Sequence, residues 1–77
     1  MKIKVIVTLK EGVLDPQGKA IQQTLNGMSF SNVEEVRQGK FFEININEND
    51  ETKAKSQIED MCKKLLANLV IEDYQII

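Results

Sequence analysis

The apolar residues of this chain repeat at two different spacings, and the order of these spacings limits the fold. Residues 2–10 alternate between apolar and polar side chains, as in a half-buried strand rich in β-branched residues. Residues 16–27 repeat at helical spacing and are preceded by Asp15, a good N-cap, with Pro16 at the first helical position. Asn26-Gly27 predicts the end of this helix, because glycine accepts the left-handed conformation. The first third of the chain is therefore predicted to be a strand followed by a helix.

The remaining residues predict a hairpin, a second helix and a last strand. Residues 32–47 indicate a hairpin that turns at Gln38-Gly39, where glycine allows a positive φ. A long apolar stripe then follows helical spacing, and Asn49 or Asp50 can cap its start. Residues 70–77 are β-branched and aromatic without a breaker, which is typical of a strand. The stripe consists of Ala54, Ile58, Met61, Cys62, Leu65, Leu66 and Leu69.

The resulting order, β-α-β-β-α-β, predicts one α+β domain over residues 1–77. We expect a four-stranded, mainly antiparallel sheet with two helices on one face, as in ferredoxin-like folds. Ile6 and Phe41 lie on the sides of their strands that such helices would leave uncovered. An apolar patch on the second face of a sheet favours a dimer interface.

The size of the chain also favours a partner. A domain of 77 residues buries only ~60% of the surface that its unfolded chain exposes, so its stability alone is marginal. One cysteine and no histidine exclude an intrachain disulfide and a Cys/His metal cage. Oligomerisation is the remaining common way to bury more apolar surface.

Charge and hydropathy argue against nucleic acid and membranes as partners. Ten basic and twelve acidic residues give a net charge of −2, whereas nucleic-acid binding usually requires a basic face. Lysines interrupt residues 1–10 too early for a signal peptide, and no apolar stretch is long enough to span a membrane. A lone thiol without an export signal indicates the cytoplasm.

The sequence predicts no catalytic, cofactor-binding or metal-binding residue. Cys62 has no histidine to activate it and lies in an apolar stripe, which favours a buried, unreactive thiol. The paired carboxylates fall in turns or on predicted exposed faces, where solvated charge is the common explanation. The segment from Gly12 to Gly18 leads into a helix, but it lacks the residues of a P-loop or dinucleotide fold, and Asp15 would repel an anion there. The carboxylate groups considered are Glu34-Glu35, Glu48/Asp50/Glu51 and Glu72-Asp73.

Two segments carry a resemblance to a known family. GVLDPQGKAI at residues 12–21 and CKKLLANLVIEDY at residues 62–74 resemble PurS, the small subunit of phosphoribosylformylglycinamidine synthase. The segment Val36-Arg37-Gln38-Gly39-Lys40 is similar too, so the resemblance covers nearly the whole chain. Leu69 departs from the family pattern, because proline is usual at that position. Proline would end the helix sharply, whereas leucine allows one more helical residue or an added apolar contact.

The resemblance implies a subunit of an enzyme complex without an active site of its own. In that complex a glutaminase subunit releases ammonia, and a large synthetase subunit uses ATP, with magnesium, to make formylglycinamidine ribonucleotide in purine biosynthesis. The resemblance implies that this chain binds no cofactor, forms a homodimer or higher oligomer, and bridges the two larger subunits so that ammonia can pass. We interpret three segments as contact surfaces: the turn at 12–18, the predicted hairpin tip, and residues 68–74. The residues assigned to these surfaces are Gly12, Asp15, Pro16, Gln17, Gly18, Gly39, Lys40, Asn68, Glu72 and Tyr74.

Two other functions fit the predicted order of elements. ACT-like regulatory domains share it, dimerise, and bind amino acids near a glycine-containing turn after the first strand, where Gly12 lies. A ferredoxin-like nucleic-acid-binding domain would use aromatic residues on the open sheet face, and Phe41 is one such residue.

Overall fold

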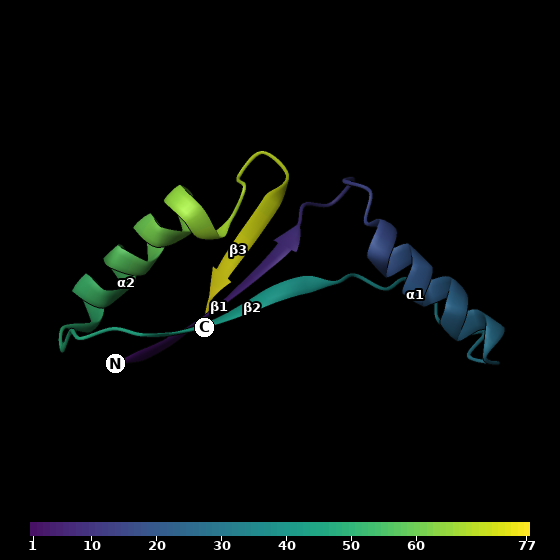
Figure 1. Ribbon diagram of the computed structural model, residues 1–77, viewed down its shortest axis with the longest axis horizontal. Helices are drawn as coiled ribbons and strands as arrows, with labels where there is room; N and C mark the ends of the chain where they lie inside the picture. Colours follow the sequence, from purple (N-terminus) through teal and green to yellow (C-terminus); the bar gives the residue numbers. More distant parts are fainter.

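The computed structural model describes residues 1–77 and shows a three-stranded sheet with one helix packed on it and one helix standing apart (Figure 1). The strands are β1 (Lys2–Leu9), β2 (Gly39–Asn45) and β3 (Glu72–Ile76), and the helices are α1 (Pro16–Gly27) and α2 (Glu51–Met61). A five-residue π-helical turn, η1 (Cys62–Leu66), continues α2. Neither α1 nor α2 has the length and apolar character that a membrane span requires.

β1 is the central strand of the sheet, whose order is β2-β1-β3, and both pairings are antiparallel. The register pairs Val5 with Phe42 on one side and with Ile76 on the other. Successive side chains of a strand point to opposite faces, so these three residues share a face with Ile3 and Val7. This is the face that α2 covers.

The core lies between β1 and α2. Val5, Ile58 and Cys62 are completely buried there, which confirms the prediction of a buried thiol. The predicted stripe on the second helix is confirmed only in part, because Leu65 and Leu69 are exposed. Asp50 caps α2 as predicted, since its carboxylate accepts the N–H groups of Thr52 and Lys53 at 2.9 and 3.3 Å. The seven buried apolar residues are Ile3, Val5, Val7, Ala54, Ile58, Cys62 and Ala67.

The prediction of four strands with two helices on one face is wrong. Residues 28–38 form turns and extended chain without a ladder, and α1 contributes no residue to the core. The apolar residues Val33 and Val36 are three apart rather than two, so they do not present one face of a strand. Figure 1 shows α1 and α2 on opposite sides of the three strands, with α1 directed away from the sheet.

The predicted turn at Gln38-Gly39 and the predicted left-handed glycine at position 27 are also wrong. Gly39 begins β2 opposite Thr8, and a Cβ at this position would lie 2.5 Å from the carbonyl oxygen of Val7. Glycine is needed there for close packing rather than for a positive φ. The first helix ends at Gly27 as expected, but the residue with the left-handed conformation is Ser29.

The molecule is elongated because of residues 10–38, which we call the arm. The Cα radius of gyration is 15.9 Å, whereas a compact chain of this length is expected to have one of ~11–12 Å. The Cα atoms extend over 49 × 24 × 14 Å. The arm therefore carries α1 beyond the end of the sheet.

Candidate interface at the junction of sheet and arm

The start of α1 is fixed to the returning part of the arm by one carboxylate. Asp15 accepts the backbone N–H of Gly18 at 2.9 Å, as an N-cap, and the backbone N–H of Gln38 at 2.9 Å with its other oxygen. The N–H groups of Gln38 and Gly18 favour the charged form and hold the pKa of Asp15 below its usual range. Sequence analysis identified the cap but missed the bond to Gln38, which joins residues 23 positions apart.

Gly18 allows the two parts of the arm to approach closely. It is buried, and a Cβ at this position would lie 2.1 Å from the backbone oxygen of Val36. The side chain of Arg37 donates to the carbonyl oxygen of Leu9, at the end of β1. Gly12, with φ of 83°, turns the outgoing chain into the arm. Glycine is therefore needed at position 12 for a positive φ and at position 18 for close packing against the backbone.

A second cluster joins β2 to the turn before β3. Lys40 lies 3.8 Å from Glu72, whose side chain is only 14% exposed. Glu72 also accepts the backbone N–H of Asn68 at 2.7 Å, and its own N–H donates to the Asn68 carbonyl at 2.7 Å. The Asn68 side chain accepts the N–H of Val70 at 3.2 Å. These bonds fix the turn and leave Val70 and Leu69 83% and 42% exposed.

The structure therefore brings together five of the ten residues that the sequence assigned to contact surfaces. A hollow of about 330 Å³ lies where the sheet meets the arm, floored by Val7 and Leu9. We call its polar rim the junction; it consists of Asp15, Gln17, Gln38, Gly39, Lys40 and Glu72. Three segments far apart in the sequence meet there. Gln38 was not predicted, and only the pairing of β1 with β2 reveals its position.

The other predicted residues lie around the junction rather than in it. Pro16 is exposed at the first position of α1, and Gly12 lines a separate hollow of about 560 Å³ between the two parts of the arm. Asn68 does not line the junction, but its backbone N–H donates to the carboxylate of Glu72, which does. Tyr74 pairs with Val7 and packs against the core, half-buried. The helix ends at Leu66, so Leu69 does not extend it.

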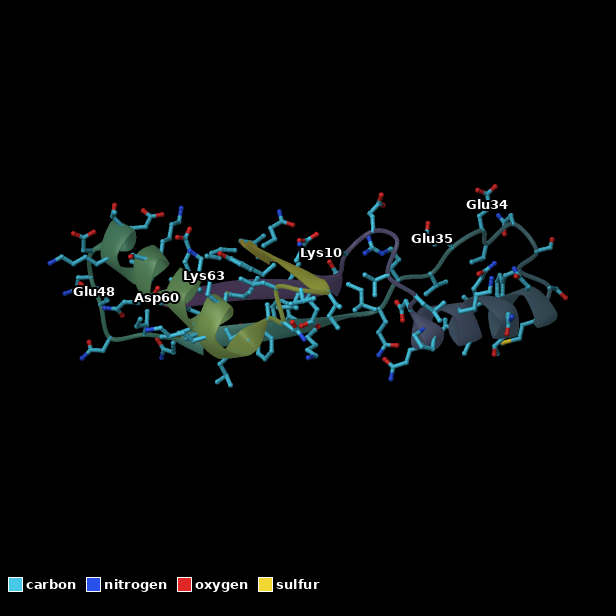
Figure 2. All side chains as sticks on the ribbon, turned by 90° about the horizontal axis from the view of Figure 1, so that it is seen from above. Lys10, Glu34, Glu35, Glu48, Asp60 and Lys63 are labelled. Carbon is cyan, nitrogen blue, oxygen red and sulfur yellow. The ribbon has the colours of Figure 1, made fainter.

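No arrangement of catalytic groups accompanies the junction. Both carboxylate oxygens of Asp15 accept backbone N–H groups, and Glu72 is held by the turn. Glu34 and Glu35, labelled in Figure 2, project from the arm and are exposed. Glu48 accepts the N–H groups of Asn49 and Asp50 before α2. No group of three or more acidic or cysteine side chains is placed to hold a metal ion.

The thiol of Cys62 is expected to be unreactive in the folded chain. Burial, and then the charge of Glu59, raise the pKa of Cys62, which lowers its thiolate fraction. We expect Cys62 to react with a thiol reagent at least ~100-fold more slowly than in urea-unfolded chain, because reaction requires local opening. A matched control is Leu65→Cys in a Cys62→Ala background, because Leu65 lies on the same turn but is 84% exposed. Equal rates for the two thiols in the folded chain would contradict the burial of Cys62.

Comparison with known proteins identifies the family. The family model described as "PurS: Phosphoribosylformylglycinamidine (FGAM) synthase" matches residues 2–77. The PurS subunit of phosphoribosylformylglycinamidine synthase from Methanocaldococcus jannaschii is 51% identical over 75 residues, which cover 97% of this chain and 90% of that protein. The Bacillus subtilis subunit is 50% identical over 74 residues, covering 96% and 87%.

Solved structures agree with the sequence match. The crystal structure of M. jannaschii PurS, at 51% identity, superposes with a TM-score of 0.89 and covers 99% of this chain and 92% of that chain. A chain in the structure of PurLQS from Thermotoga maritima, at 28% identity, superposes with a TM-score of 0.91, with coverage of 99% and 93%. The overall fold of the chain is thus shared with these structures. This chain belongs to the PurS family of phosphoribosylformylglycinamidine synthase subunits.

Proposed function

We propose that this chain is the non-catalytic adaptor of a phosphoribosylformylglycinamidine synthase complex in purine biosynthesis. It bridges the glutaminase subunit and the ATP-dependent synthetase subunit and supports ammonia transfer between them. It works as a homodimer or higher oligomer in the cytoplasm. ATP and magnesium bind to the synthetase subunit, and this chain binds no cofactor, nucleic acid or membrane.

The convergence of three segments on the junction is the observation that carries the proposal. An adaptor needs a surface that is already ordered before the partner binds, because ordering costs binding free energy. The hydrogen bonds of Asp15 and Glu72 go to backbone groups, so they fix chain segments rather than activate a substrate. The PurLQS structure from T. maritima supports an assembly of this kind, since it contains a chain of the same fold.

The alternative of an ACT-like amino-acid sensor loses its basis in the fold. That interpretation required a four-stranded sheet with both helices on one face, and the sheet has three strands with α1 directed away. The nucleic-acid alternative has one exposed aromatic residue on the open sheet face, Phe41, on a chain with a net charge of −2. The structure therefore favours neither the amino-acid sensor nor the nucleic-acid-binding domain.

Reconstitution tests the proposal. The chain is mixed with the glutaminase and synthetase subunits of its own organism, and co-elution and glutamine-dependent ATP turnover are measured. We expect turnover with glutamine to depend on this chain and turnover with added ammonia to proceed without it. A chain that neither co-elutes nor raises glutamine-dependent turnover would exclude the adaptor role.

Two lysine variants locate the contact within that experiment. Lys40 and Lys55 each lie 3.8 Å from a glutamate and have similarly exposed side chains, 63% and 59%, but only Lys40 lies at the junction. We expect Lys40→Ala to raise the concentration of chain needed for half-maximal turnover by about 10-fold, the scale of losing one directional charged contact. Lys55→Ala is expected to stay within about 2-fold, because exposed ion pairs contribute little. Equal effects of the two variants would place the contact elsewhere.

A further inference from the structure

The helix that covers the sheet ends in a wide turn that exposes a leucine. At ~100° per residue, Leu65 would lie within ~20° of the completely buried Ile58 if the helix stayed regular. Instead, the Ala67 N–H donates to the Cys62 carbonyl at 3.0 Å, five residues back, so this turn holds one residue more than an α-helical turn. Leu66 packs against the core, whereas Leu65 is 84% exposed. Turns of this kind are frequent at functional sites.

Two more apolar residues are exposed directly after this turn. Leu69 is 42% exposed and Val70 is 83% exposed, where the chain turns back into β3 (Figure 1). We call Leu65, Leu69 and Val70 together the knob. All three lie within six residues of the chain, and none belongs to the hydrophobic core or to the residues packed against it. Exposed apolar side chains that gather in this way indicate a contact with another molecule.

The turn that carries the knob is ordered by its own hydrogen bonds. The Asn68 carbonyl accepts the N–H groups of Ile71 and Glu72 at 3.0 and 2.7 Å. The Asn68 side chain accepts the Val70 N–H at 3.2 Å, and the Glu72 carboxylate accepts the Asn68 N–H at 2.7 Å. Lys40, 3.8 Å from Glu72, ties the turn to β2. A partner that binds the knob therefore does not have to order this segment first, which lowers the cost of binding.

The charges next to the knob are positive and unpaired. Lys63 and Lys64 are exposed and directly precede Leu65, and neither belongs to any of the four ion pairs of the chain. Two copies that met symmetrically through their knobs would bring these lysines together, and like charges disfavour such a contact. The complementary surface is instead an apolar socket with carboxylates on its rim.

The knob and the junction are continuous through one residue. Glu72 lines the junction, and its carboxylate also holds the N–H of Asn68, one residue before Leu69. One partner surface can therefore cover the junction and the knob together, in a contact broader than either alone. Of the two subunits that the proposed function brings to this chain, the synthetase is the larger and offers the broader surface.

We propose that the knob docks into an apolar socket, rimmed by carboxylates, on the synthetase subunit of the complex. Leu65 and Val70 supply the buried apolar contact, and Lys63 and Lys64 pair with the carboxylates of the rim. This inference rests on the proposed adaptor function, to which it adds the surface and the partner chemistry that hold the chain in place.

The first test places a negative charge in the socket. Leu65→Glu is compared with Gln57→Glu, which makes the same change of charge at an exposed residue ~12 Å earlier along the helix. In the reconstituted complex, we expect Leu65→Glu to raise the concentration of chain needed for half-maximal glutamine-dependent turnover by at least ~30-fold, because its carboxylate would be buried among apolar groups. Gln57→Glu and Leu65→Met are each expected to stay within ~3-fold. Equal effects of the two glutamate variants would overturn the proposal.

A stability measurement separates lost docking from lost folding. Leu65 is 84% exposed, so the urea midpoint of Leu65→Glu is expected to match that of the wild-type chain. A midpoint lowered enough to account for the loss of turnover would assign Leu65 a structural role and overturn the docking role.

The second test concerns the carboxylate rim. Lys64→Glu is compared with Lys53→Glu, because Lys53 is also exposed, lies on the same helix and takes part in none of the four ion pairs. We expect Lys64→Glu to raise the half-maximal concentration by ~10-fold at low salt and by less at ~0.5 M salt, where exposed charges are screened. Lys53→Glu is expected to stay within ~2-fold. An effect of Lys64→Glu no larger than that of Lys53→Glu would contradict the rim.

The third test identifies the partner. Val70→Cys is labelled with a benzophenone maleimide, which the buried Cys62 does not take up, and the reconstituted complex is irradiated. We expect a cross-linked product with the synthetase subunit, and none from Gln57→Cys labelled in the same way. A product with the glutaminase subunit or with a second copy of this chain, or no product at all, would overturn the assignment.

These outcomes are distinguishable from a failure of the adaptor function. If the wild-type chain raises glutamine-dependent turnover and Leu65→Glu does so equally well, the knob is overturned and the adaptor function stands. If the wild-type chain neither co-elutes with the synthetase subunit nor raises turnover, both are overturned.

Discussion

Gly18→Ala is expected to separate α1 from the returning part of the arm. The added Cβ would lie 2.1 Å from the Val36 oxygen and 2.7 Å from a carboxylate oxygen of Asp15. The first neighbour is backbone and cannot rotate away, so the cost should fall at the upper end of the ~1–3 kcal/mol typical of overpacking, or above it. Hydrogen exchange of the α1 amides measures the effect directly. We expect faster exchange there and little change in β1.

Gly27→Ala is the matched control for this substitution. Gly27 lies on the same helix, has no neighbour within 4 Å of an added Cβ, and does not have a positive φ. Alanine is there expected to be neutral or to stabilise the helix by up to ~1 kcal/mol, since glycine is the poorer helix former. Faster α1 exchange in both variants would mean that Gly18 matters through helix propensity and not through contact with Val36.

Ile58→Ala is expected to produce the largest loss of global stability. Ile58 is completely buried between α2 and β1, and the core has only seven buried apolar residues. Truncation of a buried isoleucine costs ~2–5 kcal/mol, through lost transfer free energy and the cavity left behind. Native proteins are stable by only ~5–15 kcal/mol, and small ones lie at the low end. Urea denaturation followed by circular dichroism should show a lower midpoint or no cooperative transition.

Gln57→Ala serves as the control for the core substitution. Gln57 is the neighbouring residue on α2 and is exposed. A surface change of this kind is expected to alter the unfolding free energy by no more than ~0.5 kcal/mol. A loss below ~1 kcal/mol for Ile58→Ala would mean that the sheet and α2 do not form the main stabilising contact.

The elements that could be predicted from the sequence are those fixed by local signals. Asp15 and Pro16 predicted the start of α1 correctly, and Asp50 predicted the start of α2. Strict alternation predicted β1 to within one residue. In each case the deciding contacts lie within a few positions along the chain, so periodicity and capping residues are sufficient.

The errors concern residues whose role depends on distant chain segments. Gly39 looks like a turn residue, but it is a glycine because the carbonyl of Val7 lies against it. Val33 and Val36 suggested a fourth strand, yet the segment that contains them follows α1, where the Asn26 side chain donates to the Val33 carbonyl. The π-helical turn after Met61 leaves no clear sequence signal, since Leu65 and Leu66 fit an ordinary helical stripe equally well.

The sequence identified individual residues of the candidate site but not their arrangement in space. The motifs at 12–18, 39–40 and 68–74 could be identified individually, whereas their meeting at one junction follows from the pairing of β1 with both other strands. Gln38 is the clearest example of a site residue that the sequence does not reveal. Its backbone N–H completes the hydrogen bonding of Asp15, and no property of a glutamine side chain indicates this.

The central position of β1 also sets the order in which the chain can fold during synthesis. β1 is made first, but one of its two neighbours, β3, is made last, with Val5 facing Ile76. The ladder between them cannot form until β3 has left the ribosome, and contacts of such high sequence separation form slowly. α1 needs only local bonds and the returning segment up to Gln38. The arm can therefore be complete while the sheet is still open, so a nascent chain exposes the apolar side of α1 around Ile21 before its own core exists.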